Sequence, residues 1–170
     1  MTSTVGAGDG ILMDASALDE FMTAAFGQPL NWTIEKVELD GLRVRQPTST
    51  ANSRPGGTVS GPTLMSVADG VAYMVLLSRI GPAALAVTSN LNINFLRRPR
   101  LVDLVADASI LKLGRSLAVT EVALYSDGGG ERDLLDPVAH ATITYSLALL
   151  GDGADRSDPT GGTGIQGAIQ

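Results

Sequence analysis

Apolar and polar residues recur along the chain with two different periods, which predicts two helices and six strands. The first helix is expected over Asp14–Phe26, with Asp14 as its N-cap and Gly27-Gln-Pro29 at its end. Its apolar face consists of Leu18, Phe21, Met22 and Ala25. Two strands follow, Trp32–Leu39 and Leu42–Gln46, joined by an Asp-Gly dipeptide that is typical of hairpins.

The longest apolar run, Pro62–Ile80, predicts a second helix, because it is too long for a typical strand. Pro62 suits the first helical position, where its missing N–H would have been unpaired anyway, and Gly81-Pro82 ends the run. Apolar residues occur on every side, so we expect this helix to be enclosed. A glycine-rich turn precedes it, and its N-terminus is expected to face a ligand.

Four strands are predicted after this helix, and the short links between them favour an antiparallel sheet. They cover Ala84–Leu96, Asp103–Leu113, Ser116–Ser126 and Pro137–Leu147. The middle two are joined by a tight hairpin in which Gly114 can supply a positive φ. The segment Pro47–Gly57, rich in Pro, Thr, Ser, Asn and Gly, is expected to be a loop.

Alternation within the first and last of these four strands assigns their faces. In the first strand, one face is expected to carry Val87, Leu91, Ile93 and Phe95, and the other Thr88, Asn90, Asn92 and Asn94. In the last strand, the two faces are expected to carry Ala139, Ala141, Ile143 and Tyr145 against His140, Thr142, Thr144 and Ser146. The three asparagines are expected to face solvent or a subunit interface.

The 170 residues, 44% of them hydrophobic, suffice for one globular domain with a sizeable core. We expect a flexible N-terminus over residues 1–13, a single domain over residues 14–150, and a disordered Gly/Asp-rich tail over residues 151–170. The net charge of −6 gives no general attraction to nucleic acid or to anionic membranes. An anionic ligand would therefore need a local basic cluster.

The chain has no cysteine, which excludes disulfides, a thiolate nucleophile and a cysteine-bound metal. The N-terminus lacks the positive region and apolar stretch of a secretory signal. Both observations predict a cytoplasmic location. The single histidine, His140, gives little support for a Ser-His-Asp triad or a zinc site, so no metal and no cofactor are expected.

Asp69 lies in the middle of the long apolar helix and needs an explanation. A carboxylate there is costly unless it is paired, protonated or facing a cleft. It is either an internal staple, held by backbone N–H groups or by an arginine such as Arg54, or part of a functional site, and the residues alone leave both open. A membrane span is disfavoured, because the segment is marginally long, contains this acid and has no second span beside it.

The glycine turn, the acid-bearing helix and a later strand reading Asn90-Leu-Asn-Ile-Asn-Phe-Leu-Arg-Arg-Pro99 resemble the PaaI-like (phenylacetic acid degradation) acyl-CoA thioesterases. The similarity covers roughly Trp32 to Leu147 and keeps the order of the elements. The resemblance implies an α+β hotdog fold, in which an antiparallel sheet wraps around a long central helix.

That family typically reads Asn-x-x-Gly-x-x-His-Gly-Gly, then six residues and an Asp or Glu; here Arg54-Pro-Gly-Gly-Thr-Val-Ser-Gly-Pro62 leads without a gap to Asp69. The resemblance implies that Asp69 is the catalytic carboxylate and that the Gly61 N–H polarises the thioester carbonyl. A helix N-terminus suits that role, because its unpaired N–H groups favour a developing oxyanion. Asp69 would act as a base on water or attack the thioester directly, in a neighbouring subunit's cleft.

Three positions depart from the family pattern. Ser60, counted with the catalytic residues, stands where the family usually has His, and Pro62 replaces the second Gly and removes one N–H donor. Arg54 replaces the amide side chain. It is expected to lie opposite Asp69 and weaken it as a base, to donate to the thioester carbonyl, or to hold the nucleotide phosphates.

Coenzyme A carries several negative charges, so the resemblance also implies a local basic surface. The candidates for this surface are Arg97, Arg98, Arg100, Lys112 and Arg115, although for each one alone ordinary solvated charge is the better interpretation. Tyr73, one turn after Asp69, lines the acyl pocket or is a core or interface aromatic. His140 is expected to be structural or exposed rather than catalytic.

The leading interpretation is an enzyme that hydrolyses aryl or aliphatic acyl-CoA to free acid and CoA. The resemblance further implies a homodimer or homotetramer with active sites at subunit interfaces, which would cover an open sheet edge. Two alternatives stay open: a non-catalytic module that binds acyl-CoA or lipid, and a hydratase or dehydratase that combines Asp69 with His140. The acyl specificity is not readable from the sequence.

Overall fold

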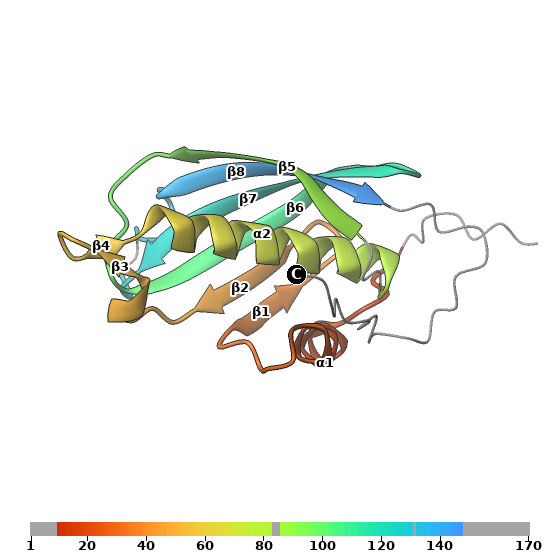
Figure 1. Cartoon of the computed structure of the whole chain (residues 1–170), viewed down its shortest axis with the longest axis horizontal. Coiled ribbons are helices and arrows are strands. Elements are labelled where there is room, and N and C mark those ends of the chain that lie inside the picture. The colour runs from red at the N-terminus through yellow and green to blue at the C-terminus, as the bar shows by residue number, and fades with distance from the viewer. Residues whose placement is uncertain (1–9, 83–85, 131, 148–170) are drawn as a thin grey trace, which may run out of the picture.

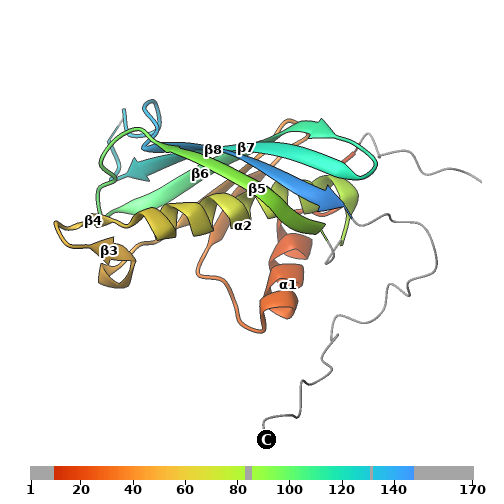
Figure 2. The same ribbon diagram turned by 45° about the horizontal axis from the view of Figure 1, so that its top comes forward.

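The computed structural model describes residues 10–82, 86–130 and 132–147. A six-stranded antiparallel sheet covers one long helix, α2 (Gly61–Ile80), and a shorter helix, α1 (Ala15–Phe26), packs on the far side of α2 from the sheet (Figures 1 and 2). The strands lie in the order β1-β2-β6-β7-β8-β5, and their bounds are β1 Thr33–Val37, β2 Leu42–Gln46, β5 Ala86–Phe95, β6 Asp103–Leu113, β7 Leu117–Asp127 and β8 Ala139–Leu147. The predicted order of helices and strands is confirmed.

Helix α2 forms the centre of the core. Leu64, Val67, Val71, Leu76 and Leu77 are each at most 1% exposed, and they pack with the inward-facing residues of β2, β6, β7 and β8. The helix is long and apolar enough to cross a membrane, but 56% of that segment is buried inside the protein, as in the core helix of a soluble protein. The burial favours the core helix over the membrane span.

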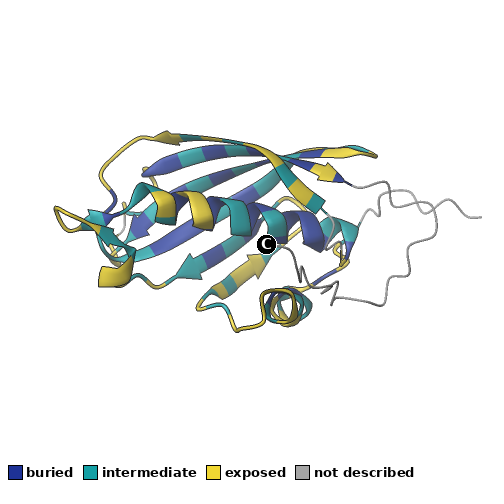
Figure 3. Cartoon of the chain, viewed as in Figure 1, coloured by how far each residue is buried: buried dark blue, intermediate teal, exposed yellow. Residues whose placement is uncertain are grey.

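The N-terminal half of α2 is less enclosed than the sequence suggested. Met65 is 41% exposed and Ser66 is also exposed, whereas the C-terminal half is buried (Figure 3). One side of the first turns of the helix is therefore open in the single chain.

Helix α1 has the predicted bounds and cap. The Asp14 carboxylate accepts a hydrogen bond from the Ala17 N–H at 3.0 Å, and Leu18 and Met22 are buried. Ala25, placed on the same apolar face by the sequence, is exposed. The packed structure begins before Asp14, because Met13 is buried. The predictions for residues 1–9 and for the tail over residues 151–170 lie outside the described residues.

The prediction that 47–57 is only a loop is wrong. This segment contains a 3₁₀ turn, η1 (Thr50–Asn52), followed by the short strand β3 (Ser53–Arg54). Strand β3 pairs with β4 (Thr58–Val59) in a hairpin whose strands are two residues long. Glycines at 56 and 57 turn this hairpin with positive φ values of 102° and 71°, a conformation that other residues rarely adopt.

Two further details differ from the sequence prediction. Helix α2 begins at Gly61, so Pro62 occupies its second position rather than its first. Gly114 does not have a positive φ; the β6–β7 turn is closed instead by the Gly114 N–H, which donates to the Leu117 carbonyl at 2.8 Å.

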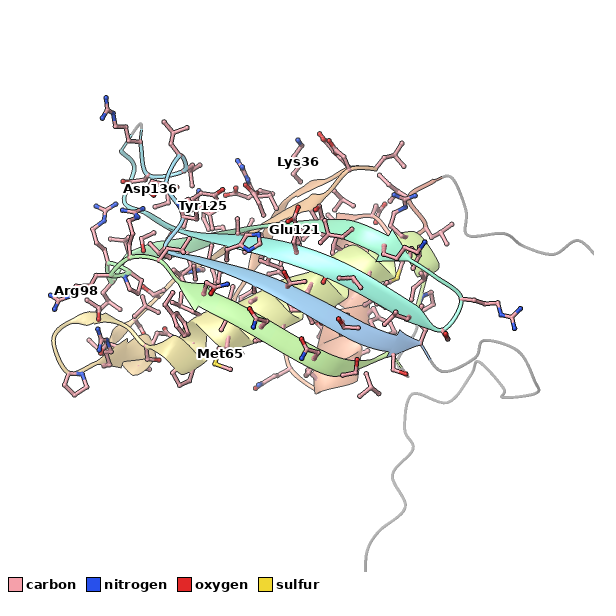
Figure 4. All side chains as sticks on the ribbon, turned by 90° about the horizontal axis from the view of Figure 1, so that it is seen from above. Lys36, Met65, Arg98, Glu121, Tyr125 and Asp136 are labelled. Atoms are coloured by element: carbon pink, nitrogen blue, oxygen red, sulfur yellow. The ribbon has the colours of Figure 1, made fainter. Side chains whose placement is uncertain are left out.

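The outer face of the sheet carries charged and polar side chains, including Lys36, Glu121 and Tyr125 (Figure 4). Arg43 donates two hydrogen bonds of 2.6 Å to the Asp107 carboxylate across β2 and β6. The predicted faces of β8 are confirmed, because burial alternates along it from Ala139 to Leu147. This alternation directs Tyr145 toward helix α2.

Candidate active site

The Asp69 carboxylate is held by two hydroxyl groups from different strands. The Thr88 hydroxyl on β5 donates to Asp69 Oδ1 at 2.7 Å. The Tyr145 hydroxyl on β8 lies 3.0 Å from the same Oδ1 and 2.8 Å from the Asp69 main-chain carbonyl oxygen. No arginine pairs with Asp69 among the described residues. Within the described residues, the carboxylate is therefore held by two neutral hydroxyl groups and by no cation.

A cavity of about 380 Å³ opens beside this carboxylate. Its lining is mostly apolar and combines helices α1 and α2 with strands β5 and β8; its residues are Phe21, Ala24, Ala25, Phe26, Asp69, Gly70, Tyr73, Ala86, Thr88 and Tyr145. The rings of Tyr73 and Tyr145 are stacked at 6.1 Å between centroids, and Phe21 lies 6.5 Å from Tyr73. Burial raises the pKa of Tyr73, which keeps it neutral. A single charged group thus faces an apolar cavity, as in many small-molecule sites.

An irregularity in β5 brings Thr88 to Asp69. Thr88 pairs with Tyr145 of β8 and Asn90 pairs with Thr144, so Ser89 is an extra residue. The extra residue reverses the alternation, which turns Thr88 inward with Leu91 and leaves Val87 62% exposed. Regular alternation places Thr88 on the polar face, so the sequence pattern alone does not mark it as a site residue.

Trp32 packs against the helix next to Asp69. A Cβ atom added to Gly70 would lie 2.4 Å from the indole ring of Trp32, so the ring sits where a side chain would otherwise be. The glycine is required here for close approach rather than for an unusual backbone angle. Trp32 thereby supports the turn of α2 that carries the acid.

The N-terminus of α2 offers one free backbone donor. Ser60 caps the helix, with its hydroxyl oxygen accepting from the Thr63 N–H at 3.3 Å, and the Leu64 N–H donates to the Ser60 carbonyl at 3.2 Å. Pro62 has no N–H. Within the described residues, the Gly61 N–H donates no hydrogen bond. The backbone donor expected at the start of the helix is therefore present and unpaired.

Gly61 and Asp69 do not meet in one chain. They are eight positions apart on the same helix, which at about 1.5 Å per residue separates them by roughly 12 Å. Gly61 lines a second cavity, of about 490 Å³, with Arg54, Val59, Leu64, Phe95, Leu96, Arg97, Arg98 and Pro99. One substrate carbonyl cannot contact the Gly61 donor and the Asp69 acid of the same chain, since each contact requires about 3 Å.

The predicted basic residues fall into two groups. Arg97 and Arg98 line the cavity beside Gly61 and also a neighbouring hollow of about 650 Å³, which Arg100 and Arg132 share. Figure 4 places Arg98 at the end of the sheet where β5 ends. Lys112 and Arg115 lie at or near the β6–β7 turn, at the opposite end of the sheet (Figure 1). The structure therefore separates Lys112 and Arg115 from the other three basic candidates, Arg97, Arg98 and Arg100.

The Arg54 guanidinium donates to the Thr58 hydroxyl at 2.9 Å, within the β3–β4 hairpin, and lines the Gly61 cavity. It does not lie beside Asp69 of its own chain, so it is not the arginine of an internal ion pair with Asp69. His140 Nε2 is 3.4 Å from a carboxylate oxygen of Glu121 on the outer face of the sheet. Asp69 lies on the inner side, so the two residues do not form the acid–histidine pair of a hydratase. The described residues contain no cluster of three or more potential metal ligands.

Residues 56–132 match the family model of the thioesterase superfamily. A candidate thioesterase from Silicibacter sp. TM1040 is similar at 36% sequence identity over 83% of this chain and 96% of that one, with a TM-score of 0.73. A candidate thioesterase from Ralstonia eutropha JMP134, related to phenylacetic acid degradation, is similar at 26% identity over 75% of this chain and 98% of that one, with a TM-score of 0.62.

A hypothetical thioesterase from Streptococcus pneumoniae TIGR4, solved with coenzyme A, is similar at 23% identity over 69% of this chain and 88% of that one, with a TM-score of 0.58. This likeness concerns the fold alone. The search of curated proteins returned no significant match. The structural matches confirm the predicted hotdog fold and the resemblance to PaaI-like proteins. The chain belongs to the thioesterase superfamily and is a thioester hydrolase.

Proposed function

We propose that this enzyme hydrolyses acyl-CoA thioesters and that Asp69 is its catalytic carboxylate. One observation carries the proposal: a carboxylate fixed by Thr88 and Tyr145 faces an apolar, partly aromatic cavity of about 380 Å³. A cavity near the small end of the range for ligand sites supports compact acyl groups, either aryl or short aliphatic.

The carboxylate has two possible roles in hydrolysis. As a base, Asp69 takes a proton from water, the resulting hydroxide adds to the thioester carbon, and the C–S bond breaks as the thiolate of CoA leaves and recovers the proton. As a nucleophile, the carboxylate attacks the carbon itself, CoA leaves, and water then cleaves the mixed anhydride. Label in the Asp69 carboxylate after a single turnover in ¹⁸O-water would identify the nucleophilic route, because only attack of water on the Asp69 carbonyl carbon of the anhydride places it there.

The oxyanion formed in either route requires a donor, and the unpaired Gly61 N–H at the start of α2 has the right chemistry. Since Gly61 and Asp69 of one chain are roughly 12 Å apart, we assign the two halves of each site to two copies of the chain. The open face around Met65 and the exposed Phe95 and Leu96 beside Gly61, 54% and 53% exposed, support such an interface. Strand β5 is also an open edge of the sheet.

The arginines near Gly61 support CoA as the thiol half of the substrate. Arg97 and Arg100 form ion pairs with Asp136 and Asp133, whereas Arg54 and Arg98 have no acidic partner among the described residues. Unpaired guanidinium groups beside a cavity match the phosphates of a nucleotide.

The test is release of free CoA thiol from a panel of short, medium, long-chain and aryl acyl-CoAs. We expect turnover on compact acyl groups, and its loss in Asp69→Asn, which keeps the size of the side chain and removes its charge. Asp19→Asn, an exposed acid on α1, is the matched control and should keep full activity. Turnover that survives Asp69→Asn would refute the assignment, and binding of acyl-CoA without turnover on any substrate would favour a binding module.

A further inference from the structure

Tyr145 has two acceptors within reach and only one hydroxyl proton. Its oxygen lies 2.8 Å from the Asp69 main-chain carbonyl oxygen and 3.0 Å from Asp69 Oδ1. A tyrosine hydroxyl donates one hydrogen bond at a time at full strength. The proton can therefore go to the carboxylate or to the carbonyl of the same residue, and the choice depends on which oxygen is the better acceptor.

The position of Tyr145 makes it a permanent donor. The residue is 2% exposed, its ring stacks on Tyr73, and burial together with the charge of Asp69 raises its pKa. The phenol therefore stays protonated at any working pH. It cannot act as a base, and it cannot leave the site without opening the core.

The two hydroxyl groups act on the same carboxylate oxygen. Thr88 and Tyr145 both contact Oδ1, and no described residue donates to Oδ2. Oδ2 is thus the oxygen that is free to take a proton or to attack a carbon. A charged acceptor with two donors is also held in one rotamer, because any rotation breaks both bonds.

We propose that Tyr145 is a positioning residue for the reaction: its hydroxyl holds Asp69 Oδ1 while the carboxylate is charged and moves to the Asp69 main-chain carbonyl when that charge is lost. The inference rests on the proposed function of Asp69 and deepens it. When Oδ2 gains a proton or bonds to the acyl carbon, Oδ1 becomes a weaker acceptor, and the carbonyl at 2.8 Å takes the phenol proton instead. No buried donor is left unpaired in either state, which avoids a penalty during turnover.

The test compares Tyr145→Phe with Tyr125→Phe. The first removes one oxygen and keeps the ring that stacks on Tyr73, whereas the second removes the same atom on the outer face of the sheet (Figure 4). For Tyr145→Phe we expect kcat to fall about tenfold or more, as for loss of a hydrogen bond to a charged group, with KM within about twofold of the wild-type value. Tyr125→Phe should match the wild type in both constants.

A second readout does not depend on activity. In protein labelled with ¹³C at the aspartate carboxyl carbons, the Asp69 resonance is identified by its absence in Asp69→Asn. Tyr145→Phe should displace this resonance, and Tyr125→Phe should not. If Tyr145→Phe does not fold, 3-fluorotyrosine placed at position 145 is nearly isosteric and a stronger donor, and it should also displace the resonance.

Each result has a fixed meaning. An Asp69 resonance that does not respond to either change at position 145, or an unchanged kcat in Tyr145→Phe, would overturn the inference. Wild-type protein that hydrolyses no acyl-CoA would refute the proposed function, while the carboxyl resonance would still report whether Tyr145 holds Asp69.

Discussion

Thr88 reaches the Asp69 carboxylate, at 2.7 Å, because strand β5 contains one extra residue immediately after Thr88. Without that residue, regular alternation would turn the hydroxyl toward the outer face of the sheet. The bulge therefore supplies one of the two hydroxyl groups that hold Oδ1 of the proposed catalytic carboxylate, although Ser89 itself does not contact Asp69.

Thr88→Val should reduce kcat about tenfold or more, because a methyl group replaces a donor to a charged carboxylate and the shape is kept. Thr88→Ser should retain most of the activity. Steady-state assays on the best acyl-CoA provide the measurement, and Thr144→Val, a change on the outer face of β8, is the control. Equal rates for Thr88→Val and Thr144→Val would remove Thr88 from the site.

Gly70→Ala should lower thermal stability, against the usual rule that Ala is favoured over Gly in a helix by about 1 kcal/mol. The new methyl group would lie 2.4 Å from the Trp32 ring, which must move. Gly61→Ala is the matched control, since a Cβ atom there meets the Phe95 ring at an ordinary 3.5 Å. Calorimetry provides the measurement. A melting temperature that rises in Gly70→Ala would show that the Trp32 ring can move without destabilising the protein.

If each active site is built from two chains, two inactive variants with different defects should regain activity when they form mixed dimers. Gly61→Pro removes the N–H donor at a helical position that tolerates proline, and Asp69→Asn removes the acid. Each variant alone should be inactive. After unfolding and refolding together in equal amounts they should recover about a quarter of the wild-type activity, because half of the dimers are mixed and each mixed dimer has one intact site.

Gly61→Ala, which keeps the N–H, should be active without any partner. Mixtures of Gly61→Pro and Asp69→Asn that stay inactive, while a wild-type sample refolded in parallel regains its activity, would mean that the two halves of the site do not come from different chains.

Arg98→Ala should raise KM for acyl-CoA by roughly fivefold or more and change kcat little, because one charge-assisted contact to a phosphate is lost. The variant should also lose part of the dependence of KM on ionic strength. Arg115→Ala tests the opposite end of the sheet and should have no effect. A larger effect at Arg115 than at Arg98 would place the nucleotide elsewhere.

The ion pair between Asp133 and Arg100 is expected to stabilise the folded protein, and this contribution should be lost in acid. The Arg100 guanidinium, followed by the N–H groups of Gly128 and Gly130, lowers the pKa of Asp133 from an ordinary value of 3.8 to about 2. A lowered pKa in the folded state stabilises the protein above the unfolded value, and this contribution disappears as the pH falls toward 2. Asp133→Asn should therefore melt lower than the wild type at pH 6 and converge with it near pH 2.

Asp136→Asn, which removes a more exposed carboxylate that pairs with Arg97, controls for a general change in surface charge. It should track the wild type across this range. A constant difference between Asp133→Asn and the wild type at every pH would contradict the prediction.

The regular elements could be predicted because alternation and caps are local. Asp14, Leu42–Gln46 and Asp103–Leu113 stand where the sequence placed them. The β-bulges could not be predicted from the alternation of apolar and polar residues, because one extra residue in a strand leaves the amino-acid composition of that strand unchanged. Ile34 and Val37 both pack against the core although strict alternation would separate them, because β1 is irregular at Glu35.

The site was only partly predictable for a related reason. Asp69 is conspicuous as an acid in an apolar helix, but its partners come from strands 19 and 76 positions away. Thr88 looked like an outward polar residue. Tyr145 did carry a signal, since an inward-facing tyrosine among alanines and isoleucine needs a partner for its hydroxyl.

Trp32 is the only tryptophan in the chain, and its ring fills the space above Gly70. The protein therefore has a single source of tryptophan fluorescence, placed beside the turn of α2 that bears the proposed catalytic acid. Its emission should change when an acyl group enters the neighbouring cavity, without any added label. Because this signal does not require turnover, it can be followed in Asp69→Asn. Fluorescence of that variant would report the affinity for acyl-CoA separately from the rate of hydrolysis.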